Sequence, residues 1–162
     1  MDWISSIQYT IDYIEDNLDE ELDSEILAAK IFTSSFYFQR MFTILCDCTV
    51  GEYIRNRRLT LAGFEVINSK INILDIAIKY GYDTNESFTR AFTRFHGSTP
   101  STIRKNKLST NTFSRISVKS NISGGKTIMS DFSERGYVVK ETNKNKHLTL
   151  KVDAYFTKGN SL

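Results

Sequence analysis

The 162-residue sequence predicts an all-α protein with two helix-turn-helix subdomains joined by a long linker helix, followed by a short, poorly ordered or β-like C-terminal tail. Three observations predict this fold. Apolar residues recur at helical spacing through the first 107 residues. The chain matches itself imperfectly after a shift of 50 residues. The only proline, Pro100, leaves room for long uninterrupted helices.

The first 50 residues predict three helices, each with one apolar face. In the first helix the apolar residues recur at three- and four-residue steps: Trp3, Ile7, Ile11, Ile14 and Leu18. Asp23 can cap a second helix, which carries Ile26, Leu27 and Ile31. Ser34 can cap a third, whose apolar face comprises Phe38, Met41, Phe42 and Leu45. We expect these faces to form the core of a first lobe, at about residues 3–50.

A longer helix is predicted over about residues 51–68, and it carries two apolar stripes. One stripe consists of Leu59, Ala62 and Val66, and the other of Ile54, Leu61 and Phe64. A helix with two apolar faces is usually packed between two units, so this helix is the predicted linker. Gly63 lies in its middle, where glycine costs about 1 kcal/mol relative to alanine.

Three more helices form the predicted second lobe, at about residues 72–107. The first is short, ends at Gly81 and carries Ile73, Ile76, Ala77 and Tyr80. Thr84 can cap the next helix, whose apolar face comprises Phe88, Ala91, Phe92 and Phe95. Pro100 is well placed to open a last short helix, which runs to about Lys107.

The two lobes are related by sequence. After the shift of 50 residues Ile26 coincides with Ile76, Phe32 with Tyr82, Ser34 with Thr84, Phe38 with Phe88, Arg40 with Arg90, and Phe42 with Phe92. This indicates an internal repeat of one helix-turn-helix unit. We therefore predict one domain over residues 1–107 and a separate tail over residues 108–162.

The tail has a different composition, dominated by Ser, Thr, Asn, Gly and Lys. Three segments are predicted as short strands: Arg115–Lys119, Gly136–Lys140 and His147–Val152. Gly124 and Gly125 predict a break between them. With so few large apolar residues the tail makes a poor independent core, and we interpret it as a tail or a fragment of an effector domain.

The charges are unevenly distributed, although the net charge is only +2. Residues 1–29 carry nine acidic side chains and no Lys or Arg, whereas residues 30–108 carry twelve basic and six acidic side chains. A basic body suggests a polyanionic partner. The chain has no membrane-length apolar run and no leader-like start, and it has two cysteines, so we expect a cytoplasmic protein.

The repeat also places polar side chains on one outward helix face in each lobe. In the first lobe this face carries Phe36, Gln39, Arg40 and Thr43. In the second lobe it carries Glu86, Thr89, Arg90 and Thr93, with Asn85 and Ser87 at its margin. A helix fits the major groove of DNA, where Arg suits guanine, Gln or Asn suits adenine, and Glu can accept from cytosine. Glu86 has an alternative role as the i, i+4 partner of Arg90.

Phosphate contacts are expected around these faces. The candidates are Ser34, Thr43, Arg55, Arg57, Thr84, Arg94 and Lys105, with Arg58 and Arg104 as further basic candidates. A linker helix of about 17 residues spans about 26 Å, and one turn of DNA is about 34 Å. Two such helices can therefore enter successive major grooves, with some bending of the DNA.

Several segments of the chain resemble the AraC/XylS family of bacterial transcription regulators. The resemblance lies in Gln39–Phe42, Gly51–Arg55, Arg58 with Leu59 and Ala62, Ile76–Tyr82, Ser87–Phe92 and Phe95–Ser101, in the family's order and spacing. It implies a seven-helix DNA-binding domain in which the positions of Phe36, Gln39, Arg40, Asn85, Glu86, Ser87 and Arg90 face base edges. The family's first turn usually carries Gly. Here it reads Ile31-Phe32-Thr33, so we expect a remodelled turn.

The sequence contains no pattern typical of an enzyme, a cofactor site or a metal site. Cys46 and Cys48 lack further Cys or nearby His and are a weak metal signal. We therefore predict a sequence-specific regulator that binds double-stranded DNA as a monomer or weak dimer, with RNA polymerase as a second candidate partner. One alternative is an interaction module or truncated antagonist that docks on RNA polymerase or a full-length homologue. Another is a regulator whose tail senses a ligand or dimerises.

Overall fold

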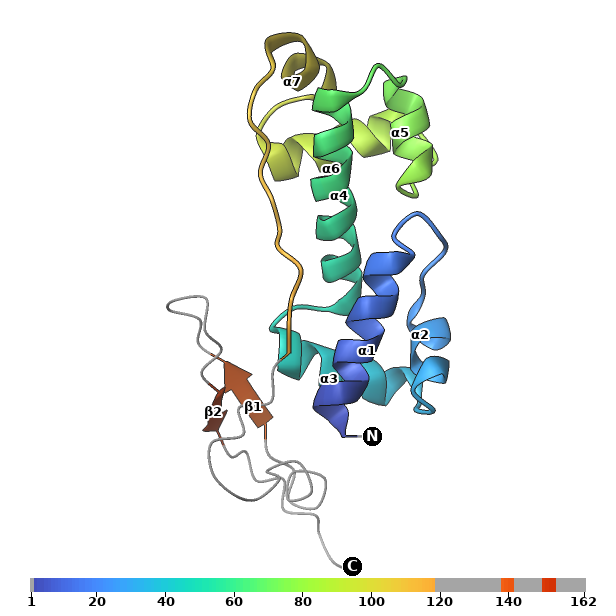
Figure 1. Ribbon diagram of the computed structural model, residues 1–162, viewed down its shortest axis with the longest axis vertical. Coiled ribbons are helices and arrows are strands. Elements are labelled where there is room, and N and C mark those ends of the chain that lie inside the picture. Colours follow the sequence, from blue (N-terminus) through green and yellow to red (C-terminus); the bar gives the residue numbers. More distant parts are fainter. Residues whose placement is uncertain (1, 119–137, 142–149, 154–162) are drawn as a thin grey trace, which may run out of the picture. The chain divides into compact units, whose positions relative to one another are not determined.

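The computed structural model describes residues 2–118, 138–141 and 150–153. It divides into two compact units. Unit 1 comprises Met1–Asp12, Ser24–Val50 and Ile116–Leu162, and unit 2 comprises Tyr13–Asp23 and Gly51–Arg115. The described part of the chain contains seven helices, as the sequence predicts, and Figure 1 labels them α1 to α7.

Unit 1 contains α2 (Ser24–Lys30), α3 (Ser35–Cys46) and most of α1 (Trp3–Asp16). The predicted apolar faces are buried: Ile7 and Ile11 of α1, Leu27 of α2, and Phe38, Phe42 and Leu45 of α3. The hydroxyl of Ser34 accepts from the amide of Tyr37 at 3.3 Å, so Ser34 is the N-cap of α3, as predicted. Ile26 is wrongly predicted as a core residue, because it lies on the outer side of the short helix α2 and is 41% exposed.

Unit 2 is built on α4 (Val50–Asn68), against which α5 (Ile73–Lys79), α6 (Asn85–His96) and α7 (Pro100–Asn106) fold. Leu59, Ala62 and Val66 of α4 form one core with Ile76, Ala77, Phe88, Phe92 and Ile103. Thr84 and Thr99 cap α6 and α7, and Pro100 opens α7, as predicted. The second apolar stripe of α4 is only partly buried, because Phe64 is 47% exposed.

The internal repeat has two registers, which corrects the uniform shift of 50 residues. In the first turn the amide of Thr33 bonds to the carbonyl of Ala28, and in the second turn the amide of Tyr82 bonds to the carbonyl of Ala77. The helices α2 and α5 and the turns that follow them are thus offset by 49 residues. Asp83 is an extra residue in the second turn, so α3 and α6 are offset by 50 residues. Phe32 therefore corresponds to Gly81 rather than to Tyr82.

The expected remodelling of the first turn does not occur. Phe32 has a φ of 55° and Gly81 a φ of 81°, so both turns use the left-handed backbone. The amide of Phe32 bonds to Ala29 O just as the amide of Gly81 bonds to Ile78 O. A side chain in this conformation costs about 1–2 kcal/mol, and the ring of Phe32 is 98% exposed. The first lobe keeps the turn at the expense of local strain.

The described part of the tail contains two short strands, β1 (Val138–Glu141) and β2 (Leu150–Asp153). They pair antiparallel, with Val138 opposite Asp153. They overlap the predicted segments Gly136–Lys140 and His147–Val152. The prediction of a strand at Arg115–Lys119 is wrong for its described residues, 115–118, which form no strand. Gly124 and Gly125 lie outside the described residues.

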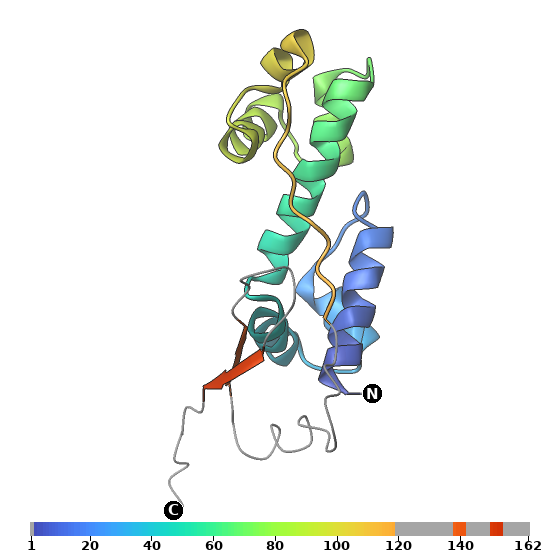
Figure 2. The same ribbon diagram turned by 60° about the vertical axis from the view of Figure 1, so that its left-hand side comes forward.

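After α7 the chain continues in an extended conformation along α4 (Figures 1 and 2). We call residues 108–115 the return segment. The amide of Phe113 donates to the hydroxyl of Thr60 on α4 at 2.9 Å. Further on, the amide of Val118 donates to Gln8 of α1 at 2.7 Å, and Val118 is buried. Residues beyond the predicted boundary at Lys107 are thus bonded to helices that precede it.

Gly63 of α4 faces the return segment and the ring of His96. A Cβ at this position would lie 2.8 Å from His96 Cε1 and 3.1 Å from Thr110 Cγ2. His96 cannot move aside cheaply, because it is buried and its Nε2 is 2.9 Å from Leu59 O. The glycine that lowers the helix propensity of α4 is therefore required by close packing.

We expect Gly63→Ala to destabilise the chain, although alanine favours helix by up to about 1 kcal/mol. Overpacking of a filled site typically costs about 1–3 kcal/mol, which exceeds that gain. Thermal unfolding followed by circular dichroism measures the difference. Gly51→Ala is the matched control, because a Cβ at Gly51 of α4 meets nothing within 4 Å. A melting temperature that rises equally in both variants would contradict the packing role of Gly63.

We expect Phe32→Gly to raise the melting temperature. The substitution relieves left-handed strain of about 1–2 kcal/mol and loses about 0.5–1 kcal/mol to the greater freedom of glycine in the unfolded chain. Gly81→Ala is the reverse control and should destabilise, because its φ is positive and its Cβ would lie 2.8 Å from Arg58 Nη1. If Phe32→Gly is less stable than the natural sequence, the turn is not strained.

Candidate nucleic-acid interface

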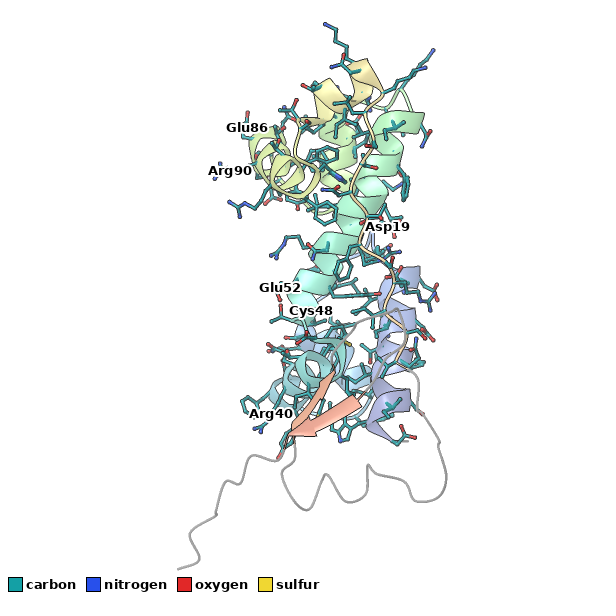
Figure 3. All side chains as sticks on the ribbon, turned by 90° about the vertical axis from the view of Figure 1, so that its left-hand side faces the viewer. Asp19, Arg40, Cys48, Glu52, Glu86 and Arg90 are labelled. Carbon is teal, nitrogen blue, oxygen red and sulfur yellow. The ribbon has the colours of Figure 1, made fainter. Side chains whose placement is uncertain are left out.

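The outward face of α3 carries the side chains that the sequence assigns to it. Phe36, Gln39, Arg40 and Thr43 are all exposed, whereas Phe38 and Phe42 on the opposite face are fully buried. Phe36 is 69% exposed, so it does not fold back into the first lobe. Arg40 projects from the exposed side of α3 (Figure 3).

Gln39 is held in place by two serines that the sequence reasoning missed. Its Nε2 donates to Ser24 Oγ at 3.1 Å and to Ser35 Oγ at 3.0 Å. Ser35 also donates to Ser24 at 2.9 Å, which links α3 to the start of α2. The amide nitrogen of Gln39 is thereby engaged. The serines give no signal in the sequence, since Ser24 precedes Gln39 by 15 residues and serine is common at helix starts.

The hydroxyl of Thr43 is less free than expected of a phosphate contact. It donates to the carbonyl of Gln39 at 2.9 Å, one turn back on α3. A phosphate oxygen needs a donor, so Thr43 must break this bond to serve one. Ser34 accepts a hydrogen bond as the N-cap, which leaves its hydroxyl proton for another acceptor.

The outward face of α6 carries Asn85, Glu86 and Arg90, and all three are exposed. Figure 3 shows Glu86 and Arg90 projecting from the same side of α6. The alternative i, i+4 ion pair between Glu86 and Arg90 is not among the salt bridges of the described residues, which include Arg57 with Glu15 and Lys79 with Glu65. Both charges on this face of α6 therefore point to solvent.

Ser87 and Thr84 form the cap of α6. The hydroxyl of Ser87 donates to Thr84 O at 2.9 Å, and the hydroxyl of Thr84 donates to Ser87 Oγ at 3.1 Å. The amide of Ser87 donates to Thr84 Oγ1 at 3.1 Å. Both hydroxyl protons are used within the cap. This arrangement gives no support to Ser87 as a donor to base edges or to Thr84 as a donor to phosphate.

The basic side chains divide into two groups. Arg40, Arg55, Arg90, Arg94 and Lys105 are exposed. Arg57, Arg58 and Arg104 are half-buried and donate to groups inside unit 2. Arg58 Nε donates to Leu18 O at 2.7 Å, its Nη2 donates to Glu20 O at 2.6 Å, and Arg104 Nε donates to Val66 O at 2.9 Å.

The hydrogen bonds of Arg57 do not support the expected phosphate contact at that position. Its Nε and Nη2 donate to the carboxylate of Glu15 at 2.8 and 2.7 Å, and its Nη1 donates to Phe113 O at 2.5 Å. The hydrogen bonds to Glu15 raise the pKa of Arg57, against the effect of burial. A guanidinium whose three nitrogens all have partners in its own unit has a structural role.

Glu15 belongs to the acidic N-terminal stretch, residues 1–29. Burial alone would raise the pKa of Glu15, but hydrogen bonds from Arg57 and Tyr53 hold it below its ordinary value. The hydroxyl of Tyr53 donates to Glu15 Oε1 at 2.6 Å. The carboxylate therefore stays charged at neutral pH and balances Arg57.

The arrangement can bind an anionic ligand by charge and can read a polar surface by side-chain donors and acceptors. Among the described residues, no three His, Cys, Asp or Glu side chains are grouped as metal ligands would be. No described helix is both long enough and apolar enough to span a bilayer.

Comparisons with known proteins agree with this fold. The helix-turn-helix domain family matches residues 27–106. The chain is 41% identical over 98 residues to the regulatory protein SoxS of Salmonella typhimurium, covering 60% of this chain and 92% of SoxS. An AraC-type transcriptional regulator from Chromobacterium violaceum superposes with a TM-score of 0.59 at 18% identity, covering 64% of this chain and 92% of that one.

The DNA-binding domain of the transcriptional factor AdpA, solved in complex with a target DNA, has the same fold. Its TM-score is 0.58 at 23% identity, and the match covers 65% of this chain and 93% of that domain. The close match to nearly the whole of SoxS, together with two helix-turn-helix lobes on a long helix, shows that this chain belongs to the AraC/XylS family of transcriptional regulators.

Proposed function

We propose that this chain regulates transcription by binding a specific sequence of double-stranded DNA, with α3 and α6 in successive major grooves. The observation that carries the proposal is the repeated outward face: an exposed arginine, Arg40 or Arg90, stands at the same position of a helix whose opposite face is fully buried. Two such faces in one chain support binding as a monomer. AdpA, which shares the fold, was solved with its target DNA.

The side chains on these faces suit direct readout of base edges. Arg40 and Arg90 can each make a bidentate contact to guanine N7 and O6. Asn85 suits adenine, Glu86 can accept from cytosine N4, and Phe36 can contact a thymine methyl. The unformed ion pair between Glu86 and Arg90 leaves both free to contact bases.

The remaining exposed basic residues fit the phosphate backbone. Arg55, Arg94 and Lys105 are exposed, and none of them forms a salt bridge within the described part of the chain. The linker α4 has 19 residues and a length of about 28 Å at 1.5 Å per residue. That length is comparable with one turn of DNA, about 34 Å.

Selection from a random double-stranded DNA pool tests the function. The natural chain should enrich a motif with two blocks about one helical turn apart. Arg40→Ala and Arg90→Ala should each cost about 1–3 kcal/mol on that motif and relax one position, in different blocks. Lys70→Ala, which removes an exposed charge from the loop before α5, is the matched control.

The absence of any enriched motif at moderate salt would refute the function. Retention of the chain by RNA polymerase subunits without DNA would then favour an interaction module. If both arginine variants keep the natural preference at every position, the assignment of the two faces is wrong.

Salt dependence separates phosphate contacts from structural arginines. Arg55→Ala and Arg94→Ala should each reduce the slope of log K against log salt concentration by about one. Arg57→Ala should leave the slope unchanged while it destabilises the fold by about 1.5–3 kcal/mol, because Glu15 loses a charged partner. The measurements are a binding titration at several salt concentrations and a thermal melt. A slope reduced by Arg57→Ala as much as by Arg55→Ala would restore Arg57 as a phosphate contact.

A further inference from the structure

The return segment lies outside the region that defines the family resemblance. The helix-turn-helix match ends at residue 106, and α7 ends at Asn106. The return segment follows and has no helix or strand of its own. It nevertheless makes defined hydrogen bonds with two helices of unit 2, α4 and α6.

The first anchor of the return segment is His96, the last residue of the recognition helix α6. The amide of Asn111 donates to His96 Nδ1 at 3.1 Å, and Asn111 Nδ2 donates to Phe95 O at 2.7 Å. On the other side of the ring, His96 Nε2 lies 2.9 Å from Leu59 O of α4. Because a carbonyl only accepts, Nε2 carries the proton and Nδ1 is the acceptor.

Both nitrogens of His96 are thus satisfied in one neutral tautomer. Burial lowers the pKa of His96, in spite of the bond to Leu59, so the neutral form is favoured. The ring also packs against Phe92 and Phe95, with ring centroids 4.2 and 4.8 Å away. The C-terminal end of α6 is consequently held between α4 and the return segment.

The second anchor lies two residues further along. Phe113 donates its amide to Thr60 and accepts from Arg57 through its carbonyl, and its ring lies 5.9 Å from that of Tyr53. The first anchor attaches to the end of α6, and the second attaches to α4, the helix against which α6 packs. A segment bonded to α4 and to the end of α6 restricts the angle between these helices.

We propose that the return segment is a positioning element for base recognition: by fixing the C-terminal end of α6 against α4, it holds Arg90 and its neighbours in register with the DNA. This rests on the proposed function. Direct readout requires side chains to be held near their productive geometry by supporting contacts. Asn111 and His96 act through α6 and touch no base themselves.

A pair of proline substitutions in the full chain tests the role of Asn111. Asn111→Pro removes the backbone donor to His96 and the side-chain donor to Phe95. Thr112→Pro is the matched control, since it places the same rigid residue at the adjacent position, which is also exposed in the return segment. Asn111→Ala is an intermediate variant that keeps the backbone donor.

Each variant is taken through selection from the random DNA pool, at a temperature at least ten degrees below its melting midpoint. The blocks read by α3 and α6 are assigned beforehand with Arg40→Ala and Arg90→Ala. We expect Asn111→Pro to lower the base preference in the α6 block about tenfold, because Arg90 is then no longer held near its productive geometry. The preference in the α3 block should stay unchanged, and Thr112→Pro should retain both.

Two outcomes would overturn the positioning role. Equal loss in both blocks, or a lower melting temperature with both preferences intact, would make the return segment a source of stability only. If Asn111→Pro and Thr112→Pro behave alike, the bonds of Asn111 are not responsible. Failure of the proposed function is distinguishable, because the natural chain itself would then enrich no motif.

Discussion

Unit 2 depends on polar side chains of α4 that donate hydrogen bonds to groups far away in the sequence. Arg57 and Arg58 lie next to each other, and each donates several hydrogen bonds to the segment from Glu15 to Glu20. The bonds to the carbonyls of Leu18 and Glu20 fix an irregular stretch that has no partner in a helix or sheet. Such bonds matter because an unpaired, desolvated peptide group costs about 1–3 kcal/mol. Arg57 and Arg58 of the linker therefore serve the fold, whereas the exposed Arg55 is the linker residue proposed to contact phosphate.

The two lobes show how one backbone turn can be built from different residues. Gly81 adopts the left-handed conformation without strain, and its missing side chain makes room for Arg58. Phe32 adopts the same conformation with its ring almost fully in solvent. Hydrogen bonds of the same pattern in both turns outweigh the local cost at Phe32. The position of each recognition helix is set by the turn geometry rather than by the residue that occupies the turn.

The sequence predicts the helices, caps and buried faces well, because these follow from local periodicity. It also places Arg40 and Arg90 on outward faces, since the residue opposite a buried phenylalanine on a helix must be exposed. It fails where partners are far apart along the chain. Glu15 and Arg57, or His96 and Asn111, are joined by folding and leave no periodic signal. The single-residue insertion at Asp83 is hard to recognise in the sequence, because Leu27 and Ala28 fall on apolar residues with an offset of either 49 or 50.

In the proposed function each lobe inserts its recognition helix into a major groove. Methylation interference on a selected binding site tests it most directly, because dimethyl sulfate modifies guanine N7 in the major groove and adenine N3 in the minor groove. We expect interference at guanine N7 in two clusters about one helical turn apart, on one face of the duplex. Interference confined to one cluster, or found mainly at adenine N3, would contradict it.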